Sequence, residues 1–261
     1  MEASFMMKKV NRLLVQIWFP MFVILIWHIY QVSAKNPFFP SFSEIQESLT
    51  YLISENILFP NLLSSFITLT TGYLTGSISA IIFALAIATN RVAVQITLPI
   101  TNFVRCVPSV AKIPVIMAIL GLGMATRIAA VSAAVFFPVF LGTLRAVLNI
   151  DKRTIEHIQV LKLGSLSSHF KFKFLTVSGE ILTNLQAALQ IAVLVTIVSE
   201  MLGSGFGIGA FVLRSQGTFM IADMWAGILI IGLLGLIVNE AFNILERRLF
   251  PWYFSQQRIS K

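Results

Sequence analysis

Long apolar runs, separated by shorter polar intervals, dominate the hydrophobic pattern of this chain. Most of these runs reach the ~20 residues that an α-helix needs to cross the hydrocarbon core of a bilayer. The pattern predicts membrane-spanning helices at about residues 13–32, 63–89, 92–122, 128–148, 183–202 and 221–245. We therefore expect an all-α, polytopic membrane protein with about six transmembrane helices.

The first apolar run ends at Val32-Ser33-Ala34, which is similar to the cleavage site of a removed signal peptide. The run is longer than the 7–15 apolar residues of a signal peptide, so we expect a retained span. The following interval contains three prolines and a short amphipathic stretch over about Phe42–Ile53. We expect an external loop there, with Glu44 and Glu47 on a solvated helix face.

Small residues recur along the second run at intervals of four, at Thr68, Gly72, Gly76 and Ala80. Residues at this spacing share one face of a helix and let a second backbone approach closely in lipid. The stripe predicts helix packing rather than a binding site.

The third run is interrupted by two charges and two prolines, Arg105, Pro108, Lys112 and Pro114. Charged side chains inside membrane spans are costly and usually face protein or a wet pathway. Proline breaks backbone hydrogen bonding, which is tolerated where a helix is buried in protein. Arg105 and Lys112 are therefore candidates for a substrate pathway, although a cation at the interface can also snorkel to water.

Five polar residues on the fifth run, spaced at 100° per residue, fall within an arc of roughly 140°. They are Thr183, Gln186, Gln190, Thr196 and Glu200. An unpaired polar group costs free energy in hydrocarbon, so this stripe faces protein or water. It either forms hydrogen bonds between helices or lines a substrate route with Glu200 near its outer mouth. Arg105 or Lys112 could neutralise Glu200 or meet an anionic substrate.

The longest polar interval of the second half covers residues 149–181. Connections of this length are usually functional. Ile155, Ile158 and Leu161 recur there at helical spacing, which predicts an amphipathic helix. Such a helix lies on the membrane surface or docks a soluble partner, and periodicity does not separate the two.

Composition agrees with a membrane protein, since 57% of the residues are hydrophobic and only 11% are charged. Soluble domains carry about 25% charged residues. The net charge of +8 is explained by cytoplasmic Lys and Arg rather than by nucleic acid binding. That bias places both termini and residues 149–181 in the cytoplasm, and leaves Lys35, Arg127 and Arg214 outside, with Arg127 in a turn after Gly121-Leu122-Gly123.

The absence of catalytic and metal-binding motifs argues against several classes of protein. The single cysteine, Cys106, excludes an intrachain disulfide, and the three histidines lack metal-ligand spacing. An intramembrane enzyme is therefore disfavoured, and no metal or cofactor is expected. The chain contains no GxxxxGK[ST] loop for ATP. A secondary transporter stays open as an alternative, because Pro108 and Pro114 permit broken helices, although no internal repeat is visible.

Several segments, taken in their order along the chain, resemble the permease subunit of ATP-binding cassette (ABC) importers, in the branch that moves sulfonates, taurine, nitrate and related small compounds. The matching segments are Arg105–Pro108, Phe136–Val139, Ser199–Gly207, Ala226–Leu236 and Leu245–Leu249. The likeness covers roughly residues 60–252. It implies a type I ABC importer permease-like fold. The domains would then be residues 1–33 (cytoplasmic segment and first helix), 34–62 (periplasmic loop), 63–252 (permease domain) and 253–261 (cytoplasmic tail).

The resemblance assigns the amphipathic part of residues 149–181 to ATPase coupling. The family carries a Glu-Ala-Ala, three residues, Gly motif there; Glu156 matches the glutamate, whereas His157 and Ile158 replace the alanines. Alignment on Gly164 restores the glycine but loses the glutamate. The coupling residues that the resemblance implies are Asp151, Glu156, His157, Ile158, Leu161 and Gly164.

Partners and cargo also follow from the resemblance. It implies two ABC ATPase subunits, a second permease copy or a paralogous permease, and a periplasmic or lipid-anchored substrate-binding protein. The chain itself would be a transport subunit of a bacterial inner membrane, surrounded by lipid, and not an enzyme. The cargo would be a sulfonate-, taurine- or nitrate-like anion, or a small heterocyclic nutrient.

Overall fold

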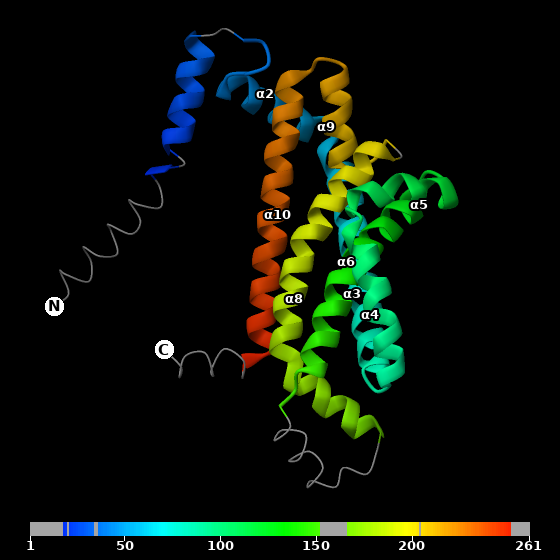
Figure 1. Cartoon of the computed structure of the whole chain (residues 1–261). Helices are drawn as coiled ribbons and strands as arrows, with labels where there is room; N and C mark the ends of the chain where they lie inside the picture. Colours follow the sequence, from blue (N-terminus) through cyan, green and yellow to red (C-terminus); the bar gives the residue numbers. More distant parts are fainter. Residues whose placement is uncertain (1–17, 20, 34–35, 152–165, 204, 252–261) are drawn as a thin grey trace, which may run out of the picture.

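The computed structural model describes residues 18–19, 21–33, 36–151, 166–203 and 205–251 (Figure 1). Within these ranges all regular elements are helices, which confirms the all-α prediction. The labelled elements are α2 (Phe42–Ser54), α3 (Leu58–Ile87), α4 (Arg91–Cys106), η1 (Val110–Lys112), α5 (Ile113–Leu120), α6 (Met124–Leu148), α8 (Leu166–Leu202), α9 (Ile208–Gly217) and α10 (Ile221–Leu249).

Four described helices are long and apolar enough to cross a membrane, namely α3, α6, α10 and the part of α8 from Phe174 to Leu202. The α4 helix and the η1–α5 segment meet at a 90° bend, and they give a fifth span if the pair is counted as one broken span. The break at 107–109 contains Pro108, as the interrupted apolar run predicts. The first predicted span falls only partly within the described residues, where Met21–Ser33 is an apolar helix.

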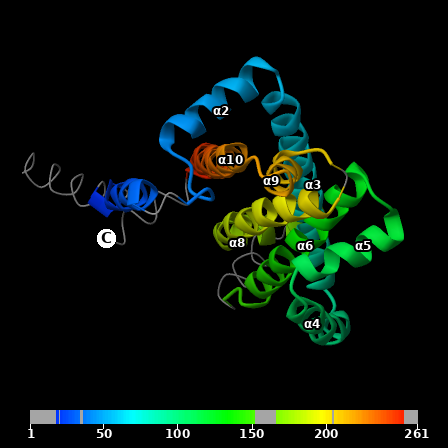
Figure 2. The same ribbon diagram turned by 90° about the horizontal axis from the view of Figure 1, so that it is seen from above.

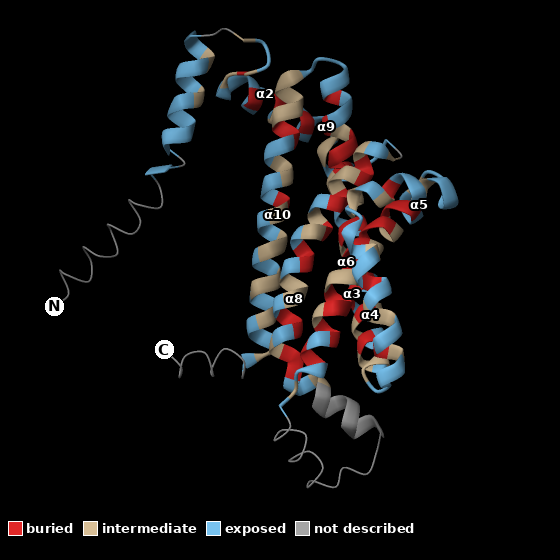
Figure 3. Cartoon of the chain, viewed as in Figure 1, coloured by how far each residue is buried: buried red, intermediate tan, exposed pale blue. Residues whose placement is uncertain are grey.

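The core of the bundle is built by α3, α6 and α8, with α6 in the middle (Figures 1 and 2). Figure 3 shows buried residues concentrated along these helices, whereas α10 and the N-terminal helix are more exposed. A Cβ on Gly72 would lie 2.6 Å from Val131 Cβ, and one on Gly76 would lie 2.6 Å from the Ser132 carbonyl oxygen. The small-residue stripe therefore packs α3 onto α6, as predicted.

The helix α8 begins earlier than the apolar run predicts, since it extends through the polar residues before Phe174 back to Leu166. A helix satisfies its own backbone hydrogen bonds, so polar side chains need not end it. The short helix α9 was not predicted at all. Its apolar residues are too few to give a span, and it lies between α8 and α10 (Figure 1).

At the end of the bundle that carries α2 and α9, aromatic side chains join the N-terminal helix to α10. The rings of Trp27 and Trp225 lie 4.4 Å apart between centroids. Trp27 Nε1 donates to the Pro40 carbonyl at 3.2 Å, and Trp225 Nε1 donates to the Phe38 carbonyl at 3.0 Å. We call this end the α9 end, and the opposite one, where α6 stops, the Asn149 end.

The amphipathic helix α2 forms where the pattern predicts it. Ser41 caps it in a reciprocal capping box with Glu44, and Ile45 and Leu52 pack against Ala226 of α10. Glu44 and Glu47 are exposed, which confirms the solvated face. The hydrogen bond from the Ser41 backbone N–H lowers the pKa of Glu44 below its ordinary value.

Candidate functional site

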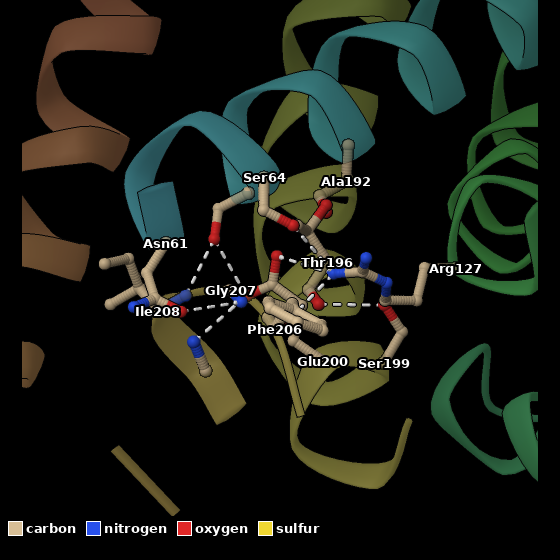
Figure 4. A network of polar contacts seen from close by, with 12 residues as sticks. Asn61, Ser64, Arg127, Ala192, Thr196, Ser199, Glu200, Phe206, Gly207 and Ile208 are labelled. Atoms are coloured by element: carbon tan, nitrogen blue, oxygen red, sulfur yellow. Dashed lines mark hydrogen bonds and ion pairs between the residues drawn. The ribbon is translucent and has the colours of Figure 1, made fainter. Parts of the chain in front are cut away.

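Two groups of polar side chains lie between the spans, and both use α8. The first, which we call the ion-pair network, joins Asn61, Ser64, Ser65, Arg127 and Glu200 to the backbone of residues 206–209 at the α9 end (Figure 4). The second, the amide ladder, contains Gln186, Gln190, Asn239 and Asn243 and lies nearer the Asn149 end.

The ion pair itself connects α6 to α8. Arg127 Nη1 lies 3.7 Å from Glu200 Oε1, and the two side chains are 3% and 0% exposed. The same nitrogen donates to Ser64 Oγ at 3.2 Å and to the Phe206 carbonyl at 2.9 Å. One guanidinium group therefore holds α3, α8 and the loop before α9.

The carboxylate of Glu200 and two side chains of α3 satisfy the start of α9. Glu200 Oε2 accepts hydrogen bonds from Ser65 Oγ at 2.9 Å and from Gly209 N at 3.0 Å. The backbone N–H groups of Ile208 and Gly207 donate to Ser65 Oγ at 2.9 Å and to Asn61 Oδ1 at 3.1 Å. The first N–H groups of a helix lack intrahelical partners, and its N-terminus favours negative charge. The network therefore caps α9 from two other helices.

Two glycines make this close approach possible. Gly207 has φ of 105°, a conformation that favours glycine. A Cβ there would overlap the carboxylate of Glu200, and a Cβ on Gly209 would overlap the Ile197 carbonyl oxygen. The Gly-Phe-Gly turn at 205–207 is thus shaped to bring backbone N–H groups against a buried carboxylate.

The position of Arg127 corrects the prediction of an external turn. Gly121 and Gly123 do form a turn, with φ of 77° and 151°, but α6 begins at Met124 and includes Arg127. The helix directs this side chain toward α3 and α8, where Glu200 neutralises it. Counting Arg127 as a loop charge was therefore wrong.

The cation that neutralises Glu200 is also not one of the two that the sequence suggested. Arg105 is exposed near the end of α4. Lys112 Nζ lies 4.8 Å from the centroid of the Phe137 ring, as in a cation–π contact. Glu200 instead pairs with Arg127, seventy-three positions earlier in the chain. A motif search misses this pair, because its signal is only two isolated charges in apolar runs.

The amide ladder joins α8 to α10. Gln186 Nε2 donates to Asn243 Oδ1 at 3.1 Å, and Gln190 Nε2 donates to Asn239 Oδ1 at 3.0 Å. Asn243 Nδ2 in turn donates to Glu240 Oε1 at 3.4 Å. Gln190 and Glu240 are exposed, and the other three are half-buried. The polar stripe in the sequence predicted only the half of the amide ladder that lies on α8. The matching signal on α10 is the four-residue spacing of Asn239 and Asn243, which equals that of Gln186 and Gln190.

The remaining members of the predicted stripe bond within α8. Thr183 is exposed and donates to the Gly179 carbonyl. Thr196 is buried and donates to the Ala192 carbonyl. The structure thus divides the stripe into a buried part near Glu200 and a half-exposed part at the two glutamines.

Of the coupling residues, only Asp151 falls in the described part of the chain, where it is exposed. The others, Glu156, His157, Ile158, Leu161 and Gly164, lie outside the described residues. The segment is flanked by α6 and α8, which pack together at the Asn149 end through Ala146, Val147, Val177 and Ile181. The described residues contain no group of three or more His, Cys, Asp or Glu side chains placed to hold a metal ion.

Comparison with known proteins gives consistent results. A family model described as binding-protein-dependent transport system inner membrane component matches residues 72–251. A putative ABC transporter permease of Methanocaldococcus jannaschii is 25% identical over 94% of both chains. A putative aliphatic sulfonates transport permease of Bacillus subtilis is 26% identical, covering 89% of this chain and 85% of its own. A nitrate import permease of Leptolyngbya laminosa is 26% identical, covering 88% of this chain and 85% of its own.

Proposed function

Because the chain belongs to the family of inner membrane components of binding-protein-dependent transport systems, we propose that it forms the path by which a small solute crosses the membrane. It is the permease of an ABC importer, and the alternatives of a secondary transporter or an intramembrane enzyme are not supported. The observation that carries this function is the family match, which includes the spans α6, α8 and α10, the amide ladder, and the Arg127–Glu200 pair.

The substrate is a small anion of the sulfonate or nitrate type. This proposal rests on relatives whose names specify aliphatic sulfonates and nitrate. Arg105 and Lys112, beside the bend between α4 and α5, supply positive charge that would meet such an anion. A small heterocyclic nutrient is the second candidate, because sequence likeness to a permease does not fix the cargo.

The amide ladder lines the substrate route. Gln190 and Glu240 are exposed on membrane-spanning helices, and polar groups facing lipid cost free energy. A second permease copy, or a paralogous one, would cover this face and leave a polar passage. Gln186 and Gln190 would contact the substrate there, whereas Glu200 would shape the end of the route from within the chain.

Two ATPase subunits drive transport, and each binds residues 151–164 of one permease. The support is the amphipathic pattern of that segment, the match of Glu156 to the family glutamate, and the packing of the two flanking helices, α6 and α8, against each other. Each permease carries one such segment, so two permeases are needed for two ATPases. Cysteine crosslinking from position 156 should succeed only with the ATPase present, and native mass spectrometry should show two permease chains.

The complex lies in the cytoplasmic (inner) membrane of a bacterial cell, with both termini and the coupling segment in the cytoplasm. The excess of Lys and Arg in those segments supports this orientation. The α9 end would then face outward, toward a periplasmic or lipid-anchored binding protein that delivers the solute.

Uptake into proteoliposomes tests the function. The chain, its ATPase and its binding protein are reconstituted with ion gradients dissipated, and labelled taurine, nitrate and a pyrimidine are offered in turn. We expect uptake of at least one only when ATP and the binding protein are both present. Uptake that follows an imposed proton or sodium gradient without ATP would instead identify a secondary transporter.

A further inference from the structure

The ion-pair network joins segments that are far apart in the sequence. Asn61, Ser64 and Ser65 come from α3, Arg127 from α6 and Glu200 from α8, and they hold the loop before α9 and the start of that helix (Figure 4). The carbonyl of Phe206 is fixed by Arg127, although its side chain is 67% exposed. The α9 ends of α3, α6 and α8 are thus joined to α9 by one ion pair and the hydrogen bonds around it.

The two charges depend on each other. Glu200 Oε1 and Arg127 Nε have no hydrogen-bond partner among the described residues. Buried charges are tolerated when they are paired, and separating such a pair leaves an uncompensated charge in the interior. Relative movement of α6 and α8 at this level would expose that charge to an apolar environment. Movement of the tied segments as one body would not.

The α5 helix has a buried start and an exposed end, with a backbone joint on each side. Ile113 at its start is buried in the main core, and Lys112 just before it lies over the Phe137 ring. On one side lies the 90° bend at 107–109 with Pro108. On the other side lie Gly121 and Gly123, both with positive φ and both with nothing within 4 Å of an added Cβ. Ile119 near the end of α5 is 76% exposed. Hinges are a few residues that absorb large backbone changes, and the joint at Gly121 and Gly123 has that character.

We propose that Arg127 and Glu200 are positioning residues that make the α9 ends of α3, α6 and α8, together with α9, one rigid block during transport. The exposed end of α5, around Ile119, moves against this block at the Gly121–Gly123 joint, while Ile113 keeps the start of α5 in the core. The ion pair stays closed in every state of the cycle. This inference rests on the proposed function, since it concerns a protein that changes conformation with ATP.

Spin-label distances test this proposal without a known substrate. In a Cys106→Ser background, labels replace exposed residues that are outside the network. Phe66 on α3 and Leu213 on α9 report on the block, and Phe66 with Ile119 reports on the α5 joint. The tagged chain is purified with its co-expressed ATPase, and distances are compared between the nucleotide-free and the ATP–vanadate states.

We expect the 66–213 distance distribution to be the same in both states, and the 66–119 distribution to shift. A shift of the 66–213 distance, or an unchanged 66–119 distance while other parts of the complex move, would overturn the proposal. If the chain binds no ATPase, or vanadate trapping changes no distance in the complex, the proposed function fails and the inference fails with it.

A second variant separates positioning from simple folding. Glu200→Gln keeps the size of the side chain but removes the charge that faces Arg127. In complexes that elute as wild type, we expect it to broaden the 66–213 distribution, while the matched control Glu47→Gln, at an exposed carboxylate outside the network, leaves it sharp. A sharp 66–213 distribution in Glu200→Gln would show that the charge does not position α9.

Discussion

The ion-pair network and the amide ladder are both polar groups in apolar helices, and both include α8, yet they are opposite in exposure. The side chains of Arg127 and Glu200 are buried, and their neighbours are backbone groups and hydroxyls of the same chain. Gln190 and Glu240 are open on one side, although their partners are also side chains of the spans. Polarity inside a membrane span therefore has two uses. The buried charges hold helices of this chain together, whereas the partly exposed amides lie on the face where we propose a second permease.

The largest effect should come from breaking the buried pair. Arg127→Met leaves Glu200 buried without its cation, and removing one partner of a buried pair costs about 3–5 kcal/mol. We expect a large fall in the melting temperature of the protein purified in detergent. The matched control Arg105→Met changes an exposed arginine and should shift stability by less than about 0.5 kcal/mol.

The double variant Arg127→Met, Glu200→Gln sharpens this test. It removes both charges and keeps an oxygen that can accept from Gly209 N, so it should be more stable than Arg127→Met alone. Equal melting temperatures for Arg127→Met and Arg105→Met would mean that the buried ion pair does not stabilise the fold. The ion-pair network would then not differ from the amide ladder in its contribution to stability.

A smaller fall in stability is expected from adding a side chain at Gly207. Gly207→Ala combines a positive φ with overlap of the Glu200 carboxylate, and overpacking alone costs about 1–3 kcal/mol. Gly121→Ala shares the positive φ but meets nothing within 4 Å, so it should cost only the backbone strain of about 1–3 kcal/mol. Thermal unfolding of the two variants measures the difference. If Gly121→Ala is the more damaging, the network does not depend on the close approach at 207.

The amide ladder should contribute little to stability. Hydrogen bonds between membrane helices average about 0.6 kcal/mol in double-mutant cycles. A cycle of Gln186→Leu and Asn243→Leu, followed by thermal unfolding, should therefore give a coupling energy near that value. A coupling as large as that of the Arg127–Glu200 pair would remove the distinction between the two groups.

The smallest effect concerns Glu44, a solvent-exposed carboxylate at the α9 end. Hydrogen bonds from Ser41 lower the pKa of Glu44, so its stabilising contribution is present above its unfolded pKa, near 4.5, and is lost as the pH falls through the folded value. Glu44→Gln keeps the capping box geometry and should differ from wild type by a few tenths of a kcal/mol at pH 7. The difference, measured as the gap between melting temperatures, should shrink as the pH falls below 4.5. A gap that widens in acid would contradict this assignment.

The sequence predicts the parts of the fold that depend on local pattern. Apolar run length locates α3, α6 and α10, the stripe at Gly72 and Gly76 predicts the packing on α6, and Pro108 predicts the bend. The helix α9 escapes prediction because its start is capped by Asn61 and Glu200, which lie on other helices. The ion pair escapes for the same reason, since only the packing of α6 against α8 brings Arg127 to Glu200. The stripe at Gln186 and Gln190 was found, but whether it faces protein or a passage depends on a neighbour that lies outside this chain.

Transport by the Gln190→Leu variant tests most directly whether the two polar groups have different tasks. The variant is assembled with its ATPase, reconstituted beside wild type, and compared for ATP-driven uptake per complex and for melting temperature. We predict that uptake falls severalfold while assembly and melting temperature stay at the wild-type values. Normal uptake per complex by Gln190→Leu would show that the amide ladder only packs α8 against α10 and does not line the route.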